Sequence, residues 1–115
     1  MIGRADIALT GWLFIACTGV APAQAQPVDA EAAQTLAKKN DCFKCHAIDK
    51  AKKAPAYSRI AARLKTKPDG VARVVEHITT GPMVELADGS HEEHRIIDTK
   101  DPNELGNLAR WILSL

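Results

Sequence analysis

Two thiols and an imidazole lie close together at Cys42, Cys45 and His46, in the pattern Cys-x-x-Cys-His. If this segment takes about one helical turn, both sulfurs point the same way and each can add to one haem vinyl group. The histidine then lies under the porphyrin, where a ring nitrogen can bind the iron. The motif therefore predicts one haem c, covalently attached through Cys42 and Cys45, with His46 as the proximal iron ligand.

Two other chemistries use cysteines at this spacing. A thioredoxin-like dithiol should lie between a strand and a helix, and no such pattern surrounds the motif. A zinc site could recruit His91 and His94, but they follow Cys45 after a gap far longer than zinc-finger spacing. The histidine after the second cysteine favours haem, and a Cys/His zinc-binding module is the remote alternative.

Residues 1–25 have the pattern of a secretory signal peptide. Arg4 gives a basic start, an apolar run follows over 7–20, and Ala23-Gln24-Ala25 supplies small residues at a cleavage site. The run is short for a membrane span and is interrupted by threonine and glycine. We expect cleavage after Ala25, no membrane span after it, and one small domain at 26–115.

This small domain is poor in aromatic residues. Only Phe43, Tyr57 and Trp111 remain after the predicted cleavage. A chain of this size buries a modest share of its surface and usually needs an additional stabilising group. A large, mostly apolar haem would supply both the cofactor and the centre of the core.

Charge is unevenly distributed, although the net charge is only +1. Ten lysines and arginines lie between Lys38 and Lys67, around the cysteine motif, and eight acidic residues lie between Glu76 and Glu104. The basic half predicts protein redox partners with acidic docking faces. Nucleic acid is not expected as a partner, because the basic stretch lacks interleaved aromatic residues.

The first and last expected helices carry clear end signals. The first covers Asp29 to Lys39, with Asp29 as its N-cap and lysines in the last turn. The last begins at Asp101-Pro102-Asn103-Glu104, and its apolar residues recur at helical spacing to Leu115. We expect these two helices to cross and close the core.

Two further helices are expected between them. One opens at Pro55-Ala56-Tyr57 and runs to about Leu64. The other has Asp69 as a possible N-cap, carries valines and isoleucine at helical spacing, and ends before Gly81-Pro82. The fold class that follows is all-α.

The segment from Gly81 to Lys100 shows no periodicity. Asp88-Gly89 predicts a turn, and 92–95 is interpreted as a short helical turn. His77, in the helix before it, is expected to be a surface residue. A long loop in a compact domain is usually functional or disordered, and we expect this one to cross the open face of the haem.

From about Glu31 to Leu115 the chain resembles the small bacterial class I cytochromes c. The resemblance rests on the Cys-x-x-Cys-His motif, the proline-bearing loop before Tyr57 and the terminal Leu-Ala-Arg-Trp-Ile-Leu-Ser-Leu. It implies about four helices wrapped around one haem. It also implies that the Pro55 carbonyl fixes the second ring nitrogen of His46, and that Trp111 packs toward Leu36.

The distal iron ligand is where the chain departs from this family, which generally uses a methionine followed by proline. Met83 is followed by valine and lies 28 residues before Trp111, whereas His94 lies 17 residues before it, nearer the family's usual position. The sequence favours bis-histidine ligation by His46 and His94, with Met83 as the main alternative. His91, His77 and an open sixth position also remain.

The resemblance implies a periplasmic carrier that moves single electrons between redox partners, since covalent haem attachment in bacteria takes place outside the inner membrane. No nucleophile–base pair or oxyanion arrangement is visible, so an enzyme is not expected. Haem supplies the redox chemistry, and the protein sets its potential and exposure. The alternatives are a haem-based sensor and an electron-entry subunit of a dehydrogenase or oxidase.

Overall fold

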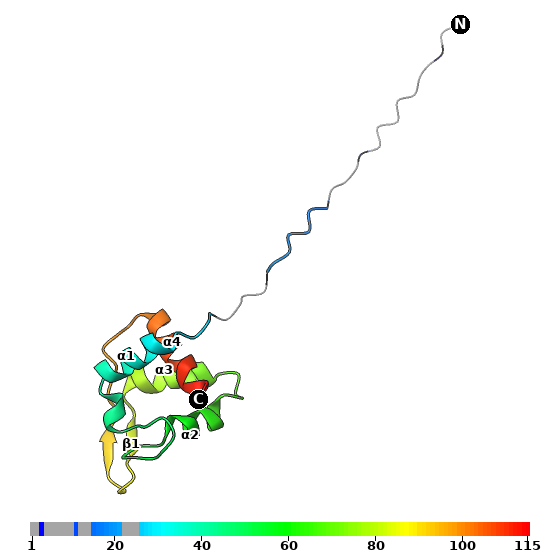
Figure 1. Ribbon diagram of the computed structural model, residues 1–115. Coiled ribbons are helices and arrows are strands. Elements are labelled where there is room, and N and C mark those ends of the chain that lie inside the picture. The colour runs from blue at the N-terminus through cyan, green and yellow to red at the C-terminus, as the bar shows by residue number, and fades with distance from the viewer. Residues whose placement is uncertain (1–2, 4–10, 12–14, 22–25) are drawn as a thin grey trace.

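The computed structural model describes residues 3, 11, 15–21 and 26–115. The predicted cleavage site at Ala23-Gln24-Ala25 and most of the predicted signal peptide lie outside the described residues. Within that part of the chain, no helix is both long and apolar enough to cross a membrane. The elements in chain order are α1 (Ala30–Lys39), the 3-10 turn η1 (Cys42–Lys44), α2 (Tyr57–Leu64), α3 (Gly70–Thr80), β1 (Met83–Glu85), β2 (His91–Glu93) and α4 (Pro102–Leu113) (Figure 1).

The first and last helices begin as their sequences predict. The Asp29 carboxylate accepts a hydrogen bond from the Ala32 backbone N–H, and the Asp101 carboxylate accepts one from Asn103. The Asn107 side chain then joins the two helices, because it both donates to and accepts from the backbone of Asp29, at 2.8 Å each. The predicted packing of α1 against α4 is therefore confirmed.

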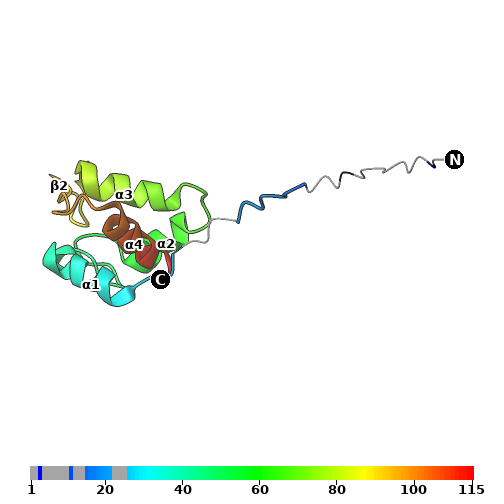
Figure 2. The same ribbon diagram turned by 90° about the horizontal axis from the view of Figure 1, so that it is seen from above.

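Helix α4 lies at the centre of the fold. Seen from above, it runs between α1 on one side and α3 on the other (Figure 2). One face of α4 is buried along its whole length, as the helical spacing of its apolar residues predicts. The buried apolar residues of the core are Ala33, Ala37, Tyr57, Val74, Ile97, Leu105, Leu108, Ala109, Trp111 and Ile112.

The three aromatic residues of the region 26–115 form one cluster. Phe43 and Tyr57 lie edge to face with ring centres 6.0 Å apart, and Trp111 lies 6.4 Å and 5.8 Å from them in the same orientation. Such edge-to-face pairs are a favourable aromatic arrangement. The cluster fastens α4 to the cysteine motif and to the start of α2.

Helix α3 ends at Gly81, where the backbone conformation favours glycine. Gly81 has φ +63°, the left-handed conformation that commonly terminates a helix. The start of α3 differs from the prediction, because Asp69 occupies the N-cap position without capping. Its carboxylate instead accepts a hydrogen bond from Arg73 Nε at 2.8 Å, one helical turn later.

The expected helical turn at 92–95 is wrong, because this region forms a hairpin. Strands β1 and β2 pair antiparallel, with Met83 opposite Glu93 and Glu85 opposite His91. The turn predicted at Asp88-Gly89 connects them, and Gly89 has φ +84°. Each strand is three residues long and mostly exposed, so no alternation of apolar and polar residues marks it in the sequence.

Candidate functional site

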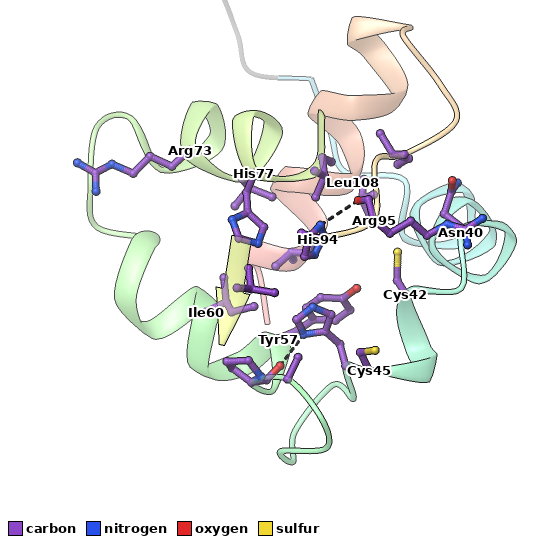
Figure 3. A pocket seen from close by; sticks show the side chains of 18 of the residues that line it. Asn40, Cys42, Cys45, Tyr57, Ile60, Arg73, His77, His94, Arg95 and Leu108 are labelled. Atoms are coloured by element: carbon purple, nitrogen blue, oxygen red, sulfur yellow. Dashed lines mark hydrogen bonds between the residues drawn. The ribbon is translucent and has the colours of Figure 1, made fainter. Parts of the chain in front are cut away.

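A cavity of about 470 Å³ opens beside the cysteine motif. Its walls come from the end of α1, η1, α2, the inner faces of α3 and α4, the hairpin and the segment that follows it (Figure 3). More than half of the wall residues are apolar, and polar and charged residues converge among them. Its branched aliphatic wall residues are Ile60, Leu64, Val74, Ile78, Val84, Leu86, Ile97, Leu108 and Ile112.

Cys42 and Cys45 lie on the same side of this cavity (Figure 3). The Cys42 carbonyl accepts hydrogen bonds from the N–H groups of Cys45 and His46, at 3.3 Å and 3.0 Å, which winds the motif into one turn. Both thiols are unpaired and partly buried. Burial raises the pKa of the Cys42 thiol. The expected single helical turn that brings both sulfurs to one wall is confirmed.

The His46 imidazole is fixed by two contacts. Its Nδ1 lies 2.7 Å from the Pro55 carbonyl oxygen, and its ring stacks on Tyr57 with centres 4.8 Å apart. When Nδ1 donates its proton to that carbonyl, Nε2 is left unprotonated and can bind a metal. Burial lowers the pKa of His46, which favours the neutral imidazole that a metal requires.

His94 shares the cavity with His46. The two ring centres are 6.3 Å apart, with the ring planes inclined by 48°. His94 Nδ1 lies 2.9 Å from the Arg95 carbonyl oxygen, which leaves Nε2 of this second imidazole available as well. The structure thus brings together two imidazoles whose Nδ1 atoms are both occupied by backbone carbonyls.

The segment that carries His94 is held by backbone contacts with the end of α3. The His94 N–H donates to the Pro82 carbonyl at 2.8 Å, and the Ile97 N–H donates to the Ile78 carbonyl at 2.9 Å. Gly81 packs so closely that a Cβ there would lie 2.9 Å from the His94 carbonyl oxygen. These contacts place His94 on the cavity wall.

His77, one of the less favoured candidate ligands, also lines the cavity. The surface position predicted for it is confirmed, because its side chain is exposed. Its ring nevertheless faces the cavity and lies 4.4 Å from the His94 ring, in an edge-on arrangement (Figure 3). Burial lowers the pKa of His77, and the neighbouring His94 lowers it further.

The other candidate ligands lie elsewhere. Met83, the first residue of β1, has 62% of its surface exposed and is not part of the cavity wall. His91 is exposed in β2, where its Nε2 lies 4.0 Å from the Glu85 carboxylate. In the described part of the chain, no three His, Cys, Asp or Glu side chains gather closely enough to hold a metal ion.

Comparison with known proteins identifies the family of the chain. The family model described as Cytochrome c matches residues 30–115. The chain is 30% identical over 82 residues to cytochrome c-551 of Pseudomonas denitrificans, covering 71% of this chain and 95% of that protein. It is also 30% identical over 90 residues to cytochrome c-551 of Pseudomonas aeruginosa, covering 78% and 83%.

Solved structures give the same result. The class 1 cytochrome MtoD of Sideroxydans lithotrophicus ES-1 superposes with a TM-score of 0.73 at 43% identity, covering 76% of this chain and 97% of that one. Cytochrome c552 of Nitrosomonas europaea superposes with a TM-score of 0.56 at 27% identity, covering 70% and 96%.

The chain belongs to the cytochrome c family. Its four helices, with one small hairpin among the described residues, form the all-α fold of a small class I c-type cytochrome. The cofactor is one covalently attached haem c, and the protein is a haem-based electron carrier that works with protein redox partners. Two partly buried thiols, two imidazoles and apolar walls are groups that fit this cofactor.

Proposed function

We propose that this protein is an exported cytochrome that carries single electrons between partners in the periplasm and catalyses no reaction of its own. Support comes from the signal-peptide pattern at residues 1–25 and from membership of the cytochrome c family. In this proposal the domain is 26–115, and α1 begins four residues after the new N-terminus, at Ala30. Haem c supplies an iron centre that changes reversibly by one electron.

Each residue of the motif has a separate task. Cys42 and Cys45 hold the haem covalently, and His46 is the proximal ligand. The Pro55 carbonyl keeps the His46 ring in one tautomer and orientation, because it accepts the Nδ1 proton. The apolar walls limit the access of water and so influence the potential of the iron.

His94 is the distal ligand in this proposal. The observation that carries it is the pairing of two imidazoles across one cavity, each with Nδ1 on a backbone carbonyl. A metal–imidazole nitrogen distance of about 2.0 Å, with each ring centre roughly 1.1 Å further on, separates two ring centres by about 6 Å. The observed 6.3 Å agrees with that spacing, whereas Met83 would have to leave an exposed position.

A pair of variants tests the assignment by optical spectroscopy. Replacing His94 with alanine should abolish the low-spin spectrum of the oxidised protein, because one axial ligand is lost. Met83→Ala is the matched control and should leave the spectrum unchanged. A methionine-to-iron charge-transfer band in the red that disappears in Met83→Ala would contradict the assignment. A second imidazole also lowers the potential relative to a thioether ligand.

Partner choice is proposed to follow the basic residues around the motif. Lys38, Lys44, Lys50, Lys52 and Lys53 are all exposed. Exposed charges of one sign steer a complementary partner, and salt screens this attraction over about 10 Å. The rate of electron transfer to an acidic partner should fall as ionic strength rises. A rate that does not change with salt would remove this part of the proposal.

A further inference from the structure

The end of α1 is fastened to the chain that follows His94. Three consecutive residues at this end, Lys39, Asn40 and Asp41, contact the segment 95–98 and are called here the α1 clasp. Lys39 Nζ lies 3.5 Å from the Asp98 carboxylate. The other two contacts are made by Asn40 and Asp41, whose roles the sequence alone does not show.

Asn40 is the buried part of the α1 clasp. It is 2% exposed, and both ends of its side-chain amide are used. The amide nitrogen donates to the Leu36 carbonyl at 3.0 Å, and the amide oxygen accepts from the Asp98 N–H at 2.9 Å. The second bond joins residues 58 positions apart and fixes the backbone four residues after His94.

Asp41 is the strained part of the α1 clasp. It has φ +59°, and among the described residues it alone combines a positive φ with a side chain. This conformation at a helix end normally selects glycine, which has no Cβ to crowd the backbone. The Asp41 carboxylate accepts from Arg95 Nη1 at 3.1 Å and lies 3.2 Å from Lys44 Nζ.

The ion pair between Asp41 and Arg95 matters because of where its two residues lie in the chain. Asp41 directly precedes Cys42, and Arg95 directly follows His94, so the pair joins the two segments on either side of the cavity. Figure 3 shows the Arg95 side chain extending from His94 toward Asn40. Movement of His94 away from the cavity would have to stretch or break this pair.

We propose that Asp41, Asn40 and Arg95 are positioning residues that hold His94 on the haem iron. This inference rests on the proposed function, in which His94 is the distal ligand. The α1 clasp couples the covalent tether at Cys42 to the sixth coordination position. When it is weakened, His94 leaves the iron more often, and an external ligand can take its place.

The variant Asp41→Gly distinguishes the positioning of His94 from a general contribution of Asp41 to stability. Glycine removes the ion pair and relieves the left-handed backbone, so the melting temperature of the haem-loaded protein should stay the same or rise. Cyanide should nevertheless bind the oxidised protein about two- to fivefold faster, the range expected for loss of one partly exposed ion pair. Arg95→Ala should accelerate binding similarly, and Arg95→Lys should restore most of the normal rate.

Lys44→Ala is the matched control. It removes the other cationic neighbour of Asp41 but leaves the contact with Arg95, so the cyanide rate should not change. Unchanged cyanide binding in both Asp41→Gly and Arg95→Ala would overturn the inference. So would acceleration that only accompanies a lower melting temperature, because that is the pattern of general loosening.

His94→Ala separates failure of this inference from failure of the ligand assignment. If His94→Ala binds cyanide much faster while Asp41→Gly and Arg95→Ala do not, the positioning role is refuted and the assignment of His94 as distal ligand stands. If His94→Ala keeps its low-spin spectrum, the distal ligand is another group. Both the assignment of His94 and the positioning role are then refuted.

Discussion

The two walls of the cavity are built in different ways. On the wall of the cysteine motif, Cys42 to Tyr57 supply both thiols, the first imidazole, the carbonyl that orients it and the ring beneath it. On the opposite wall, the segment that carries His94 is positioned by contacts with α3 and with the end of α1. The contacts with the end of α1 join residues 54 and 58 positions apart in the chain. The first wall follows from local sequence, and the second depends on assembly of the whole fold.

The largest effect is expected when both cysteines of the motif are replaced. In Cys42→Ser/Cys45→Ser the haem has no sulfur to which it can be attached, so covalent loading should be lost completely. Intact mass and haem absorbance after denaturation measure this directly. Cys17→Ser is the control, because Cys17 lies in the predicted signal peptide and should not affect loading. Covalent haem in the double variant would contradict the assignment.

An intermediate effect is expected on the opposite wall at Gly81. Alanine there must adopt φ +63° and place its Cβ 2.9 Å from the His94 carbonyl oxygen and 2.8 Å from Ile96 Cγ1. Left-handed strain and overpacking together should lower the free energy of unfolding by about 2–4 kcal/mol, measured by denaturant titration.

Gly89→Ala is the matched control for this substitution. Gly89 has φ +84°, but nothing lies within 4 Å of its added Cβ, so only the backbone cost of about 1–2 kcal/mol remains. Equal losses in the two variants would show that close packing against His94 contributes nothing.

The smallest effect is expected at Asp69, at the start of α3. The hydrogen bond from Arg73 holds the pKa of Asp69 below its usual range. Because the folded pKa is the lower one, its contribution is present above the unfolded pKa of about 3.9 and is lost as pH falls through the folded pKa. Asp69→Asn should therefore melt slightly earlier than the parent protein at neutral pH, and the two melting temperatures should converge near pH 2. A difference that persists in acid would contradict this account.

Much of the fold follows from short-range patterns in the sequence. Asp29 and Asp101 mark two helix starts, and Gly81 marks a helix end, because capping involves residues only a few positions apart. The same is true of the cysteine motif and of the Pro55 carbonyl beside His46. These features need no knowledge of distant parts of the chain.

The remaining features depend on contacts that no local pattern contains. Asn40 reads as a helix breaker, yet in the structure it is buried and bound to Asp98. His77 is expected at the surface of α3, and only the fold of the segment around His94 gives it a neighbour in the cavity. The hairpin is missed because its strands are short and mostly exposed, which leaves the turn at Asp88-Gly89 as its only signal.

The same side chains serve as hydrophobic core and as cavity wall, and this affects how the protein is made. Leu108 and Ile112 of α4 face the interior and also line the cavity. A newly made chain that still awaits its haem therefore presents this apolar interior to proteases and to other chains. Its yield in a cell should be limited by the haem attachment machinery rather than by translation, and surplus chains should be degraded instead of accumulating in colourless form.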